Sequence, residues 1–216
     1  MTGARARPVV LAAPSGTGKT TIARRLVQSG PDFCFSVSAT TRARRPYERN
    51  GVDYEFLDRA AFEERVARGD FVEWAEVHGE MYGTPRAPLE QEAVRGRHVV
   101  LDIDVQGASQ VGERIPDAVR IFLLPPSVDS LLSRLSARGT EDPEALARRL
   151  TTALAELEMV EAFDYVVVND DLEAAVQRVR ELVTGGEGVS PADMKNDVAR
   201  LREGVGLWLQ SRRTKR

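Results

Sequence analysis

"VVLAAPSGTGKTTIARRLVQS", Val9 to Ser29, is the stretch from which the fold of this chain can be predicted. Its first residues, Val9–Ala13, form an apolar run of strand length, and Thr20–Ser29 has the pattern of a helix. Between them, "APSGTGKT" has the spacing of the phosphate-loop motif G-x-x-x-x-G-K-[ST], with Ala13 in place of the first glycine. A strand, a glycine-rich turn and a helix in this order predict a nucleoside triphosphate site.

The chemistry of this loop follows from its residue types. Backbone N–H groups in a tight glycine-rich turn point inward, and the helix N-terminus adds partial positive charge. Gly16 and Gly18 allow backbone angles and a close approach that a Cβ would block. We expect Lys19 to reach the β- and γ-phosphates and Thr20 to offer its hydroxyl to Mg²⁺. The plain alternative is a glycine-rich turn that binds no ligand.

Further apolar runs of strand length alternate with helical patterns along the chain. This alternation predicts an α/β fold with a parallel sheet flanked by helices, the fold of phosphate-loop NTPases, and 216 residues are enough for one such domain. The four further strands that we expect are "FCFSVS", His98–Asp104, Val119–Leu124 and Tyr165–Asn169.

Composition excludes several classes of protein. An apolar fraction of 42% and a charged fraction of 29% are ordinary for a globular protein and exclude disordered and fibrous classes. No run approaches the roughly 20 apolar residues that span a bilayer, so no membrane partner is expected. A net charge of −3 argues against a general nucleic-acid binder. The single cysteine, Cys34, allows no internal disulfide and fits a cytoplasmic protein.

The predicted core consists of residues 8–37, 97–132 and 157–183. Residues 38–96 are too long for a simple crossover and predict an inserted α+β subdomain. The arginine-rich residues 133–156 predict a mobile lid, with Asp142-Pro143 opening a helix. Residues 184–216 form a C-terminal extension of unknown role.

A helix in this extension is predicted to be capped by Ser190, with Pro191 in its first turn. Its apolar residues are spaced three, four and three apart and therefore share one face. That face could pack on the core, mediate a dimer or stay exposed, so the oligomeric state is undetermined. The residues of this face are Val198, Leu201, Val205 and Trp208.

Two carboxylates end the predicted third strand in "LDIDVQG". Asp102 and Asp104 are two residues apart on a strand and would point to the same face. At the carboxyl edge of the sheet they could hold Mg²⁺ or its water shell, or orient cationic side chains. The alternative is a solvated strand end.

Four arginines lie in "SVSATTRARRPYERNGVDYEF", Ser36 to Phe56: Arg42, Arg44, Arg45 and Arg49. The stretch alone fits a solvated loop, a nucleic-acid patch or a cradle for one small anion. A nucleotide kinase transfers phosphate to a second phosphate, which needs its own cationic cradle and a flap that excludes water. Two arginine-rich segments in addition to the phosphate loop therefore favour a kinase.

Taken together, these motifs resemble the guanylate kinase family. The resemblance covers roughly Val9 to Leu182 and rests on "APSGTGKTT", the arginine stretch, "FVEWAEVHGEMYGT", "LDIDVQG", "RLSARGTED" and "VVVNDDLE", in this order and spacing. It implies transfer of the γ-phosphoryl group of ATP to GMP, and to dGMP, by a direct Mg²⁺-assisted in-line step in purine nucleotide metabolism. It also implies that the partners are these small molecules and not nucleic acid.

The resemblance implies roles for individual residues. Ser38 and Glu73 would contact the guanine, and Thr84 keeps the hydroxyl of a serine that many members have there. The implied GMP-binding residues are Ser38, Arg42, Arg45, Tyr54, Glu73, Tyr82, Thr84 and Asp102. The implied ATP-binding residues are Ala13, Pro14, Ser15, Gly16, Thr17, Gly18, Lys19, Thr20, Thr21 and Asn169. The implied catalytic residues are Lys19, Arg42, Arg134, Arg138 and Arg149, and the implied magnesium ligands, partly through water, are Thr20, Asp102 and Asp104.

Two positions depart from the family pattern, and two other functions remain to be weighed. Arg44 and Tyr47 stand where many members have proline and glycine, and a tyrosine would be strained if the turn needed positive φ. A guanylate-kinase-like module that binds phosphopeptides would not need Lys19. A kinase for another phosphorylated acceptor, such as ribose bisphosphate, would not need a guanine-type residue such as Glu73.

Overall fold

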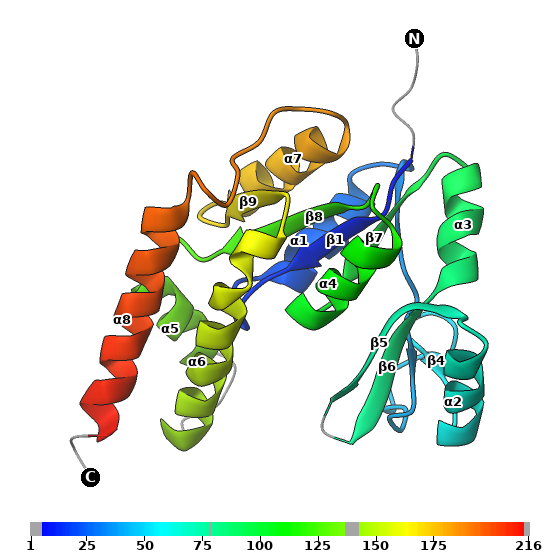
Figure 1. The fold of residues 1–216 in the computed structure, drawn as a ribbon, viewed down its shortest axis with the longest axis horizontal. Helices are drawn as coiled ribbons and strands as arrows, with labels where there is room; N and C mark the ends of the chain where they lie inside the picture. The colour runs from blue at the N-terminus through cyan, green and yellow to red at the C-terminus, as the bar shows by residue number, and fades with distance from the viewer. Residues whose placement is uncertain (1–5, 78, 137–142, 214–216) are drawn as a thin grey trace. The chain divides into compact units, whose positions relative to one another are not determined.

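The computed structural model describes residues 6–77, 79–136 and 143–213. Two β-sheets form its framework (Figure 1), one of five strands in the order β2-β7-β1-β8-β9 and one of four strands in the order β4-β3-β6-β5. Of the described residues, 6–10 and 27–119 form one compact unit and 11–26 and 120–213 form a second. The five-stranded sheet contains β1 (Val9–Ala12), β2 (Phe33–Phe35), β7 (His98–Asp102), β8 (Val119–Leu124) and β9 (Tyr165–Val168).

The central strands of this sheet, β7, β1 and β8, are almost wholly buried, which is the pattern of a parallel sheet covered on both faces. Every residue of β1 is fully buried, and five of the six residues of β8 are buried. β2 pairs with β7 in parallel, with Phe33 opposite His98, and β8 pairs with β9 in parallel, with Ile121 opposite Tyr165. The predicted α/β fold with a parallel sheet flanked by helices is confirmed.

The third strand ends earlier than the sequence predicted. β7 stops at Asp102, not at Asp104, because Asp104 is the N-cap of the next helix, α4 (Val105–Arg114). Its carboxylate accepts a hydrogen bond from the amide of Gly107 at 2.8 Å. This bond satisfies one of the helix's unpaired N-terminal amides and fixes the point where the strand turns into the helix.

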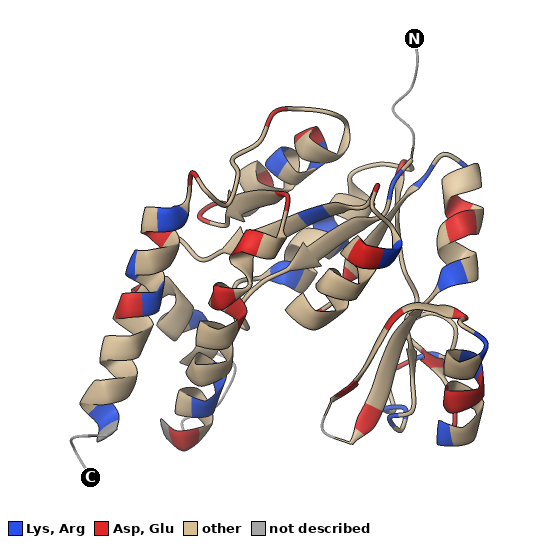
Figure 2. Cartoon of the chain, viewed as in Figure 1, with Lys and Arg blue, Asp and Glu red and all other residues tan. Residues whose placement is uncertain are grey.

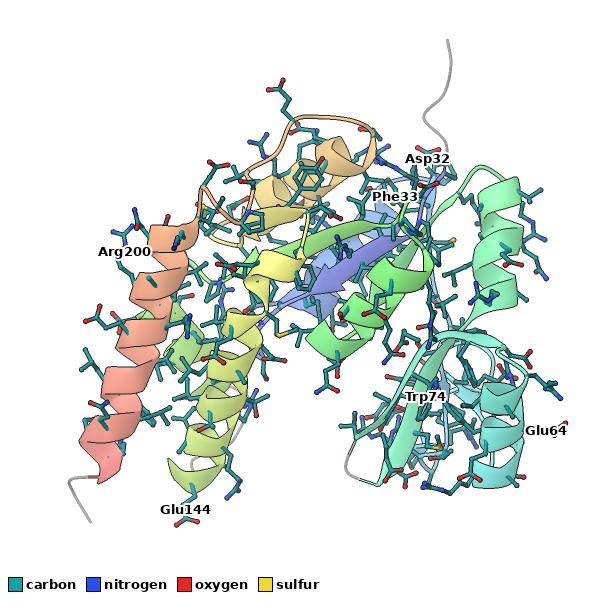
Figure 3. The ribbon with its side chains drawn as sticks, in the orientation of Figure 1. Asp32, Phe33, Glu64, Trp74, Glu144 and Arg200 are labelled. Atoms are coloured by element: carbon teal, nitrogen blue, oxygen red, sulfur yellow. The ribbon has the colours of Figure 1, made fainter. Side chains whose placement is uncertain are left out.

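The second sheet lies wholly in the first unit. It contains β3 (Ala39–Thr40), β4 (Glu55–Phe56), β5 (Phe71–Val77) and β6 (Glu80–Pro85). Helix α2 (Arg59–Ala67) packs against it through Phe62, whose ring stacks on Phe71 at 4.5 Å between centroids. Trp74 of β5 is partly buried and packs against this cluster (Figure 3). The same unit holds α3 (Arg86–Val94).

Helix α2 buries Phe62 and leaves most of its other side chains exposed. Its N-cap, Asp58, accepts a hydrogen bond from the amide of Ala61 at 2.8 Å. Acidic and basic residues mark its outer side (Figure 2), where Glu64 points away from the sheet (Figure 3) and pairs with Arg68 at 2.7 Å. Exposed pairs of this kind contribute little stability, so the buried Phe62 is what holds α2 to the sheet.

The second unit holds the remaining helices. Helix α1 follows the glycine-rich turn and buries Ile22 and Leu26, and helix α6 begins at Pro143 as predicted. The side chain of Asp171 caps α7 by accepting from the amide of Ala174. The bounds are α1 Lys19–Gln28, α5 Val128–Ser136, α6 Pro143–Glu158, the 3₁₀ helix η1 Val160–Ala162, α7 Leu172–Val183 and α8 Lys195–Arg213.

Helix α8 begins at Lys195, so the predicted start at Ser190 is wrong. The hydroxyl of Ser190 donates to the carboxylate of Asp193 at 2.6 Å and closes a turn ahead of the helix. The apolar face of α8 packs on α5 and α6 (Figure 1), with Val205 fully buried against Leu131 and Leu150. In the described parts of the chain, no helix is long and apolar enough to cross a membrane.

Candidate functional site

The glycine-rich turn between β1 and α1 is shaped by two residues with positive φ. Gly16 has φ 91° and Gly18 has φ 96°, both in the region that favours glycine. The amide of Thr17 donates to the carbonyl of Pro14 at 3.1 Å and closes the turn. A Cβ on Gly18 would lie 2.8 Å from the side-chain nitrogen of Asn169, so both backbone angle and space require glycine there.

Asn169 and Arg134 bind the backbone of this turn. Asn169 is 6% exposed, and its amide nitrogen donates to the carbonyl of Thr17 at 2.6 Å. Arg134 donates to the same carbonyl at 2.9 Å and to the carbonyl of Asn169 at 3.1 Å. These two bonds fix the carbonyl of Thr17 and so help to hold the shape of the turn. The hydroxyl of Thr17 is itself buried without a hydrogen-bond partner among the described residues.

Helix α6 contributes two further polar side chains. Arg149 donates to the Ser15 hydroxyl at 3.2 Å and to the carbonyl of Leu135 at 2.9 Å. The amide of Ser15 donates to the carboxylate of Glu156 at 3.2 Å. Sequence reasoning missed Glu156, although it follows Arg149 by seven residues and so lies on the same face of the helix.

The structure thus brings together, within the second unit, residues that the sequence placed in the ATP site. It distinguishes Arg149, which is partly buried and binds the Ser15 hydroxyl of the turn, from its neighbour Arg148, which is exposed. Thr20 is exposed in the first turn of α1. The predicted catalytic residue Arg138 lies outside the described residues. The residues of this half-site are Ala13, Pro14, Ser15, Gly16, Thr17, Gly18, Lys19, Thr20, Thr21, Arg134, Arg149 and Asn169.

A second half-site lies wholly in the first unit, as a cavity of about 220 Å³. It opens between the second sheet and the end of β7. Six of its lining residues are ones that the sequence singled out: Ser38, Tyr54, Glu73, Tyr82, Asp102 and Asp104. The rest of the lining is small or apolar.

Glu73 is the buried acid of this cavity. It is 6% exposed and lies opposite Thr84 on the neighbouring strand, whose hydroxyl donates to its carboxylate at 2.5 Å. Burial raises the pKa of Glu73 to about 7, and the negative charge of Asp104 acts in the same direction. Near neutral pH this carboxyl is therefore present in both its protonated and its ionised forms, and the ionised form can accept hydrogen bonds from a ligand.

Gly107 gives this carboxylate its space. A Cβ at Gly107 would lie 2.8 Å from one carboxylate oxygen of Glu73 and 3.4 Å from a carboxylate oxygen of Asp104. A real Cβ would displace the Glu73 side chain. The absence of a side chain at Gly107 therefore leaves room for the carboxylate of Glu73 beside α4.

The arginine stretch is organised by one buried acid, Glu48. It is 5% exposed and accepts two hydrogen bonds from the guanidinium of Arg42, at 3.1 and 2.8 Å, and one from the amide of Arg45 at 2.8 Å. The hydrogen bond from Arg42 is the main cause that lowers the pKa of Glu48, and the same bond raises the pKa of Arg42. Glu48 thus ties the side chain of Arg42 to the backbone of Arg45 within this loop.

Arg42 connects this loop to the cavity. Its guanidinium carbon lies 5.5 Å from the centroid of the Tyr54 ring, and Tyr54 meets Tyr82 edge to face at 6.2 Å. Both tyrosines line the cavity, whereas Arg42 and Arg45 are not among its lining residues. Arg42 therefore adjoins the cavity through the ring of Tyr54.

The two departures from the family pattern are accommodated at the surface. The amide of Glu48 donates to the carbonyl of Arg45 at 3.1 Å, which makes Tyr47 the third residue of a turn. Tyr47 is 75% exposed, and its hydroxyl accepts from Arg45 at 3.2 Å. Arg44 is exposed and donates to the carbonyl of Glu48 at 2.6 Å. Both substituted side chains thus add hydrogen bonds to the loop.

The donor chemistry of the expected magnesium ligands fits the ion. Thr20, Asp102 and Asp104 offer hydroxyl and carboxylate oxygens, which Mg²⁺ prefers. No group of three or more His, Cys, Asp or Glu among the described residues could hold a metal. Mg²⁺ bound with a nucleotide needs only one or two protein oxygens, since phosphates and water supply the others. One oxygen of Asp104 is already engaged in capping α4.

Comparison with known proteins gives a consistent result. Residues 5–185 match the sequence profile of the family described as guanylate kinase. The chain is similar to the guanylate kinase of Symbiobacterium thermophilum, with 49% identity over 175 residues, 81% of this chain and 83% of that one. It is 45% identical to the guanylate kinase of Myxococcus xanthus over 199 residues, 92% and 94% of the two chains. A crystal structure of guanylate kinase from Anaplasma phagocytophilum matches with a TM-score of 0.68 and 34% identity, over 85% and 87% of the two chains.

Proposed function

The chain belongs to the guanylate kinase family, and on that premise we propose that it transfers the γ-phosphoryl group of ATP to GMP, giving ADP and GDP. The observation that carries the choice of acceptor is the buried carboxylate of Glu73 in the first unit's cavity. The glycine-rich turn of the second unit is the ATP half-site, and the cavity is the GMP half-site.

Glu73 reads the guanine. Guanine presents its N1–H and N2–H₂ as adjacent donors, and one carboxylate can accept both. Adenine offers no such pair, so AMP would leave the buried carboxylate with Thr84 but with no donor on the base, and the loss of those donors costs about 1–3 kcal/mol or more. Thr84 orients the carboxylate from the neighbouring strand. Ser38 adds a hydroxyl at the same cavity wall.

The arginine stretch and two tyrosines hold the GMP phosphate. Arg42 and Arg45 supply planar, bidentate donors for a phosphate dianion. Tyr54 and Tyr82 donate from the cavity wall. Glu48 holds the guanidinium of Arg42 in place until the phosphate arrives.

The ATP half-site binds the triphosphate through the loop amides, with Lys19 on the β- and γ-phosphates. Mg²⁺ held by Thr20, with Asp102 and Asp104 acting partly through water, would neutralise charge on the phosphate oxygens. Arg134 and Arg149 stabilise the negative charge that spreads over the transferring group. Arg138 is proposed for the same role on the family resemblance alone.

The reaction needs no covalent intermediate and no general base. The acceptor phosphate is already ionised near neutral pH, so an oxygen of GMP attacks the γ-phosphorus in line while ADP leaves. The residues act by positioning and by cationic charge. dGMP should also serve, because the roles above involve only the base and the phosphate. The single cysteine, which leaves no internal disulfide, supports a reducing compartment such as the cytoplasm.

Two other functions are less well supported. A phosphopeptide-binding module would have no use for Lys19 or for the arginines at the glycine-rich turn. A kinase for a ribose bisphosphate would have no use for a buried carboxylate paired with Thr84. Both alternatives predict no turnover of GMP.

A coupled assay of ADP formation with GMP, dGMP, AMP, UMP and CMP tests the proposal. We expect turnover of GMP and dGMP, and little with the other three. The Lys19→Ala variant is the negative control and should lose turnover. Equal rates with AMP and GMP would overturn the guanine assignment, and no turnover of any nucleotide would overturn the kinase assignment.

A further inference from the structure

Strand β5, which carries Glu73, is an edge strand. It is the last strand of the order β4-β3-β6-β5 and pairs with β6. The outward N–H and C=O groups of an edge strand have no partners in the sheet and are ordinarily left to water. The pairing register also shifts between Phe71 and Glu73, so the ladder is irregular just before the acid.

Helix α4 supplies the missing partners on either side of Glu73. At Trp74, the residue after Glu73, the side-chain amide of Gln110 donates to the backbone carbonyl at 2.9 Å and accepts from the backbone amide at 3.2 Å. At Val72, the residue before Glu73, the guanidinium of Arg114 donates to the backbone carbonyl at 2.9 Å. The polar groups of the strand's backbone are thus held on both sides of the acid.

The spacing of these contacts matches the geometry of the two elements. Four residues of an α-helix rise about 6 Å, and two residues of a strand rise about 6.6 Å, so Gln110 and Arg114 reach backbone groups two residues apart. Gly107 precedes Gln110 by three residues and lies on the same helical face. That face therefore both spaces the carboxylate and holds the strand that carries it.

We propose that Gln110 and Arg114 are positioning residues for guanine recognition, because they fix the backbone of β5 and so aim the carboxylate of Glu73 into the cavity. Neither residue need touch the nucleotide. Gln110 suits the task since its amide is both donor and acceptor and can bind one residue's N–H and C=O together. The inference rests on the proposed function of Glu73 and extends it to the helix behind.

A loosened strand should affect one substrate only. Fixing a recognition group before binding lowers the cost of ordering it when the ligand arrives. Loss of the hydrogen bonds from Gln110 and Arg114 to β5, here called the clamp, should therefore raise KM for GMP and leave KM for ATP unchanged. The preference for GMP over IMP, which lacks the N2 amino group, should also fall.

The variants Gln110→Ala and Arg114→Ala test this, with Glu113→Ala as the matched control. Glu113 is an exposed residue of the same helix. We expect KM for GMP to rise about tenfold in Gln110→Ala and about threefold in Arg114→Ala, as loss of one or two hydrogen bonds implies. Arg114→Lys should restore most of the affinity. Effects no larger than those of Glu113→Ala would overturn the proposal, as would a parallel rise in KM for both substrates.

A double-mutant cycle with Glu73→Gln separates this proposal from the function beneath it. If Gln110 acts through Glu73, Gln110→Ala should change the GMP to IMP preference far less in the Glu73→Gln background than in the native chain. If the two changes have additive effects on the GMP to IMP preference, the positioning role of Gln110 is wrong and the role of Glu73 still stands. An unchanged preference in Glu73→Gln by itself would overturn the role of Glu73, and the purpose of the clamp with it.

Discussion

The hydroxyl of Thr84 donates a hydrogen bond to the carboxylate of Glu73 across the β5–β6 pair, at 2.5 Å. Both residues are buried, so the carboxylate depends on this bond more than an exposed acid would. The bond favours the ionised form of Glu73, while burial, the larger effect, disfavours it and raises the pKa of this carboxyl to about 7. Near neutral pH, Glu73 is therefore present in both its protonated and its ionised forms.

The raised pKa predicts a pH dependence of GMP binding. Guanine donates hydrogen bonds, so it needs the ionised carboxylate, and with a pKa of about 7 the ionised fraction is about one tenth at pH 6 and about nine tenths at pH 8. KM for GMP should therefore fall about tenfold from pH 6 to pH 8. The phosphate of GMP also titrates near pH 6, so the control is Glu73→Gln, which retains only that contribution. Identical profiles for the two proteins would contradict the prediction.

Thr84→Val should weaken GMP binding. Valine has nearly the shape of threonine but cannot donate, which leaves a buried carboxylate oxygen unsatisfied at a cost of about 1–3 kcal/mol. KM for GMP should rise about tenfold with little change in KM for ATP. Thr84→Ser keeps the hydroxyl and should restore binding. Failure of the serine variant to do so would mean that shape, and not the hydrogen bond, matters at this position.

Glu48→Gln should loosen the arginine stretch. The change removes the charge that holds Arg42 through two hydrogen bonds and that also accepts from the amide of Arg45. We expect KM for GMP to rise about fivefold or more, since charge-assisted bonds are the stronger kind. Arg49→Ala, which changes an exposed arginine of the same stretch, is the control and should be near native. If Glu48→Gln and Arg49→Ala raise KM for GMP equally, Glu48 does not organise the arginine stretch.

Arg149 and Arg148 are adjacent on α6 and should differ sharply. Arg149 binds the Ser15 hydroxyl at the glycine-rich turn, whereas Arg148 is exposed. Arg149→Ala should lower kcat about a hundredfold, the size expected when a donor to the transition state is lost. Arg148→Ala should lower it less than about threefold. Steady-state rates at saturating GMP and ATP decide between them, and a larger loss in Arg148→Ala would reverse the assignment.

Val205→Ala should destabilise the packing of α8 on α5 and α6. Val205 is fully buried in that cluster, and truncation of such a side chain costs about 2 kcal/mol. The melting temperature should fall by about 6 °C. Leu207, on the same helix, is 58% exposed, and Leu207→Ala should leave the melting temperature nearly unchanged. Equal melting temperatures for the two variants would show that the helix face does not stabilise the fold.

Features built from neighbouring residues could be predicted from the sequence. The strand, turn and helix from Val9 to Gln28 form where expected, because glycine angles, the lysine position and helix periodicity are local properties. The buried strand β8 matches its predicted bounds for the same reason. The helix start at Ser190 was wrong because the hydroxyl of Ser190 binds Asp193 in a separate turn. The sequence around Ser190 does not show whether its hydroxyl caps a helix or binds a nearby side chain in a turn.

The nucleotide half-sites were predicted as sets of residues, and their geometry was not. The sequence by itself determined the glycine-rich turn, the parallel sheet and the identity of the acids and arginines, because each is written in residues close along the chain. Only the tertiary structure decided that Glu156 binds Ser15, 141 residues away, and that Gln110 holds Trp74, 36 residues away. It also decided the pKa of Glu73, because burial depends on Gly107 and Thr84 from other elements and no local pattern encodes it.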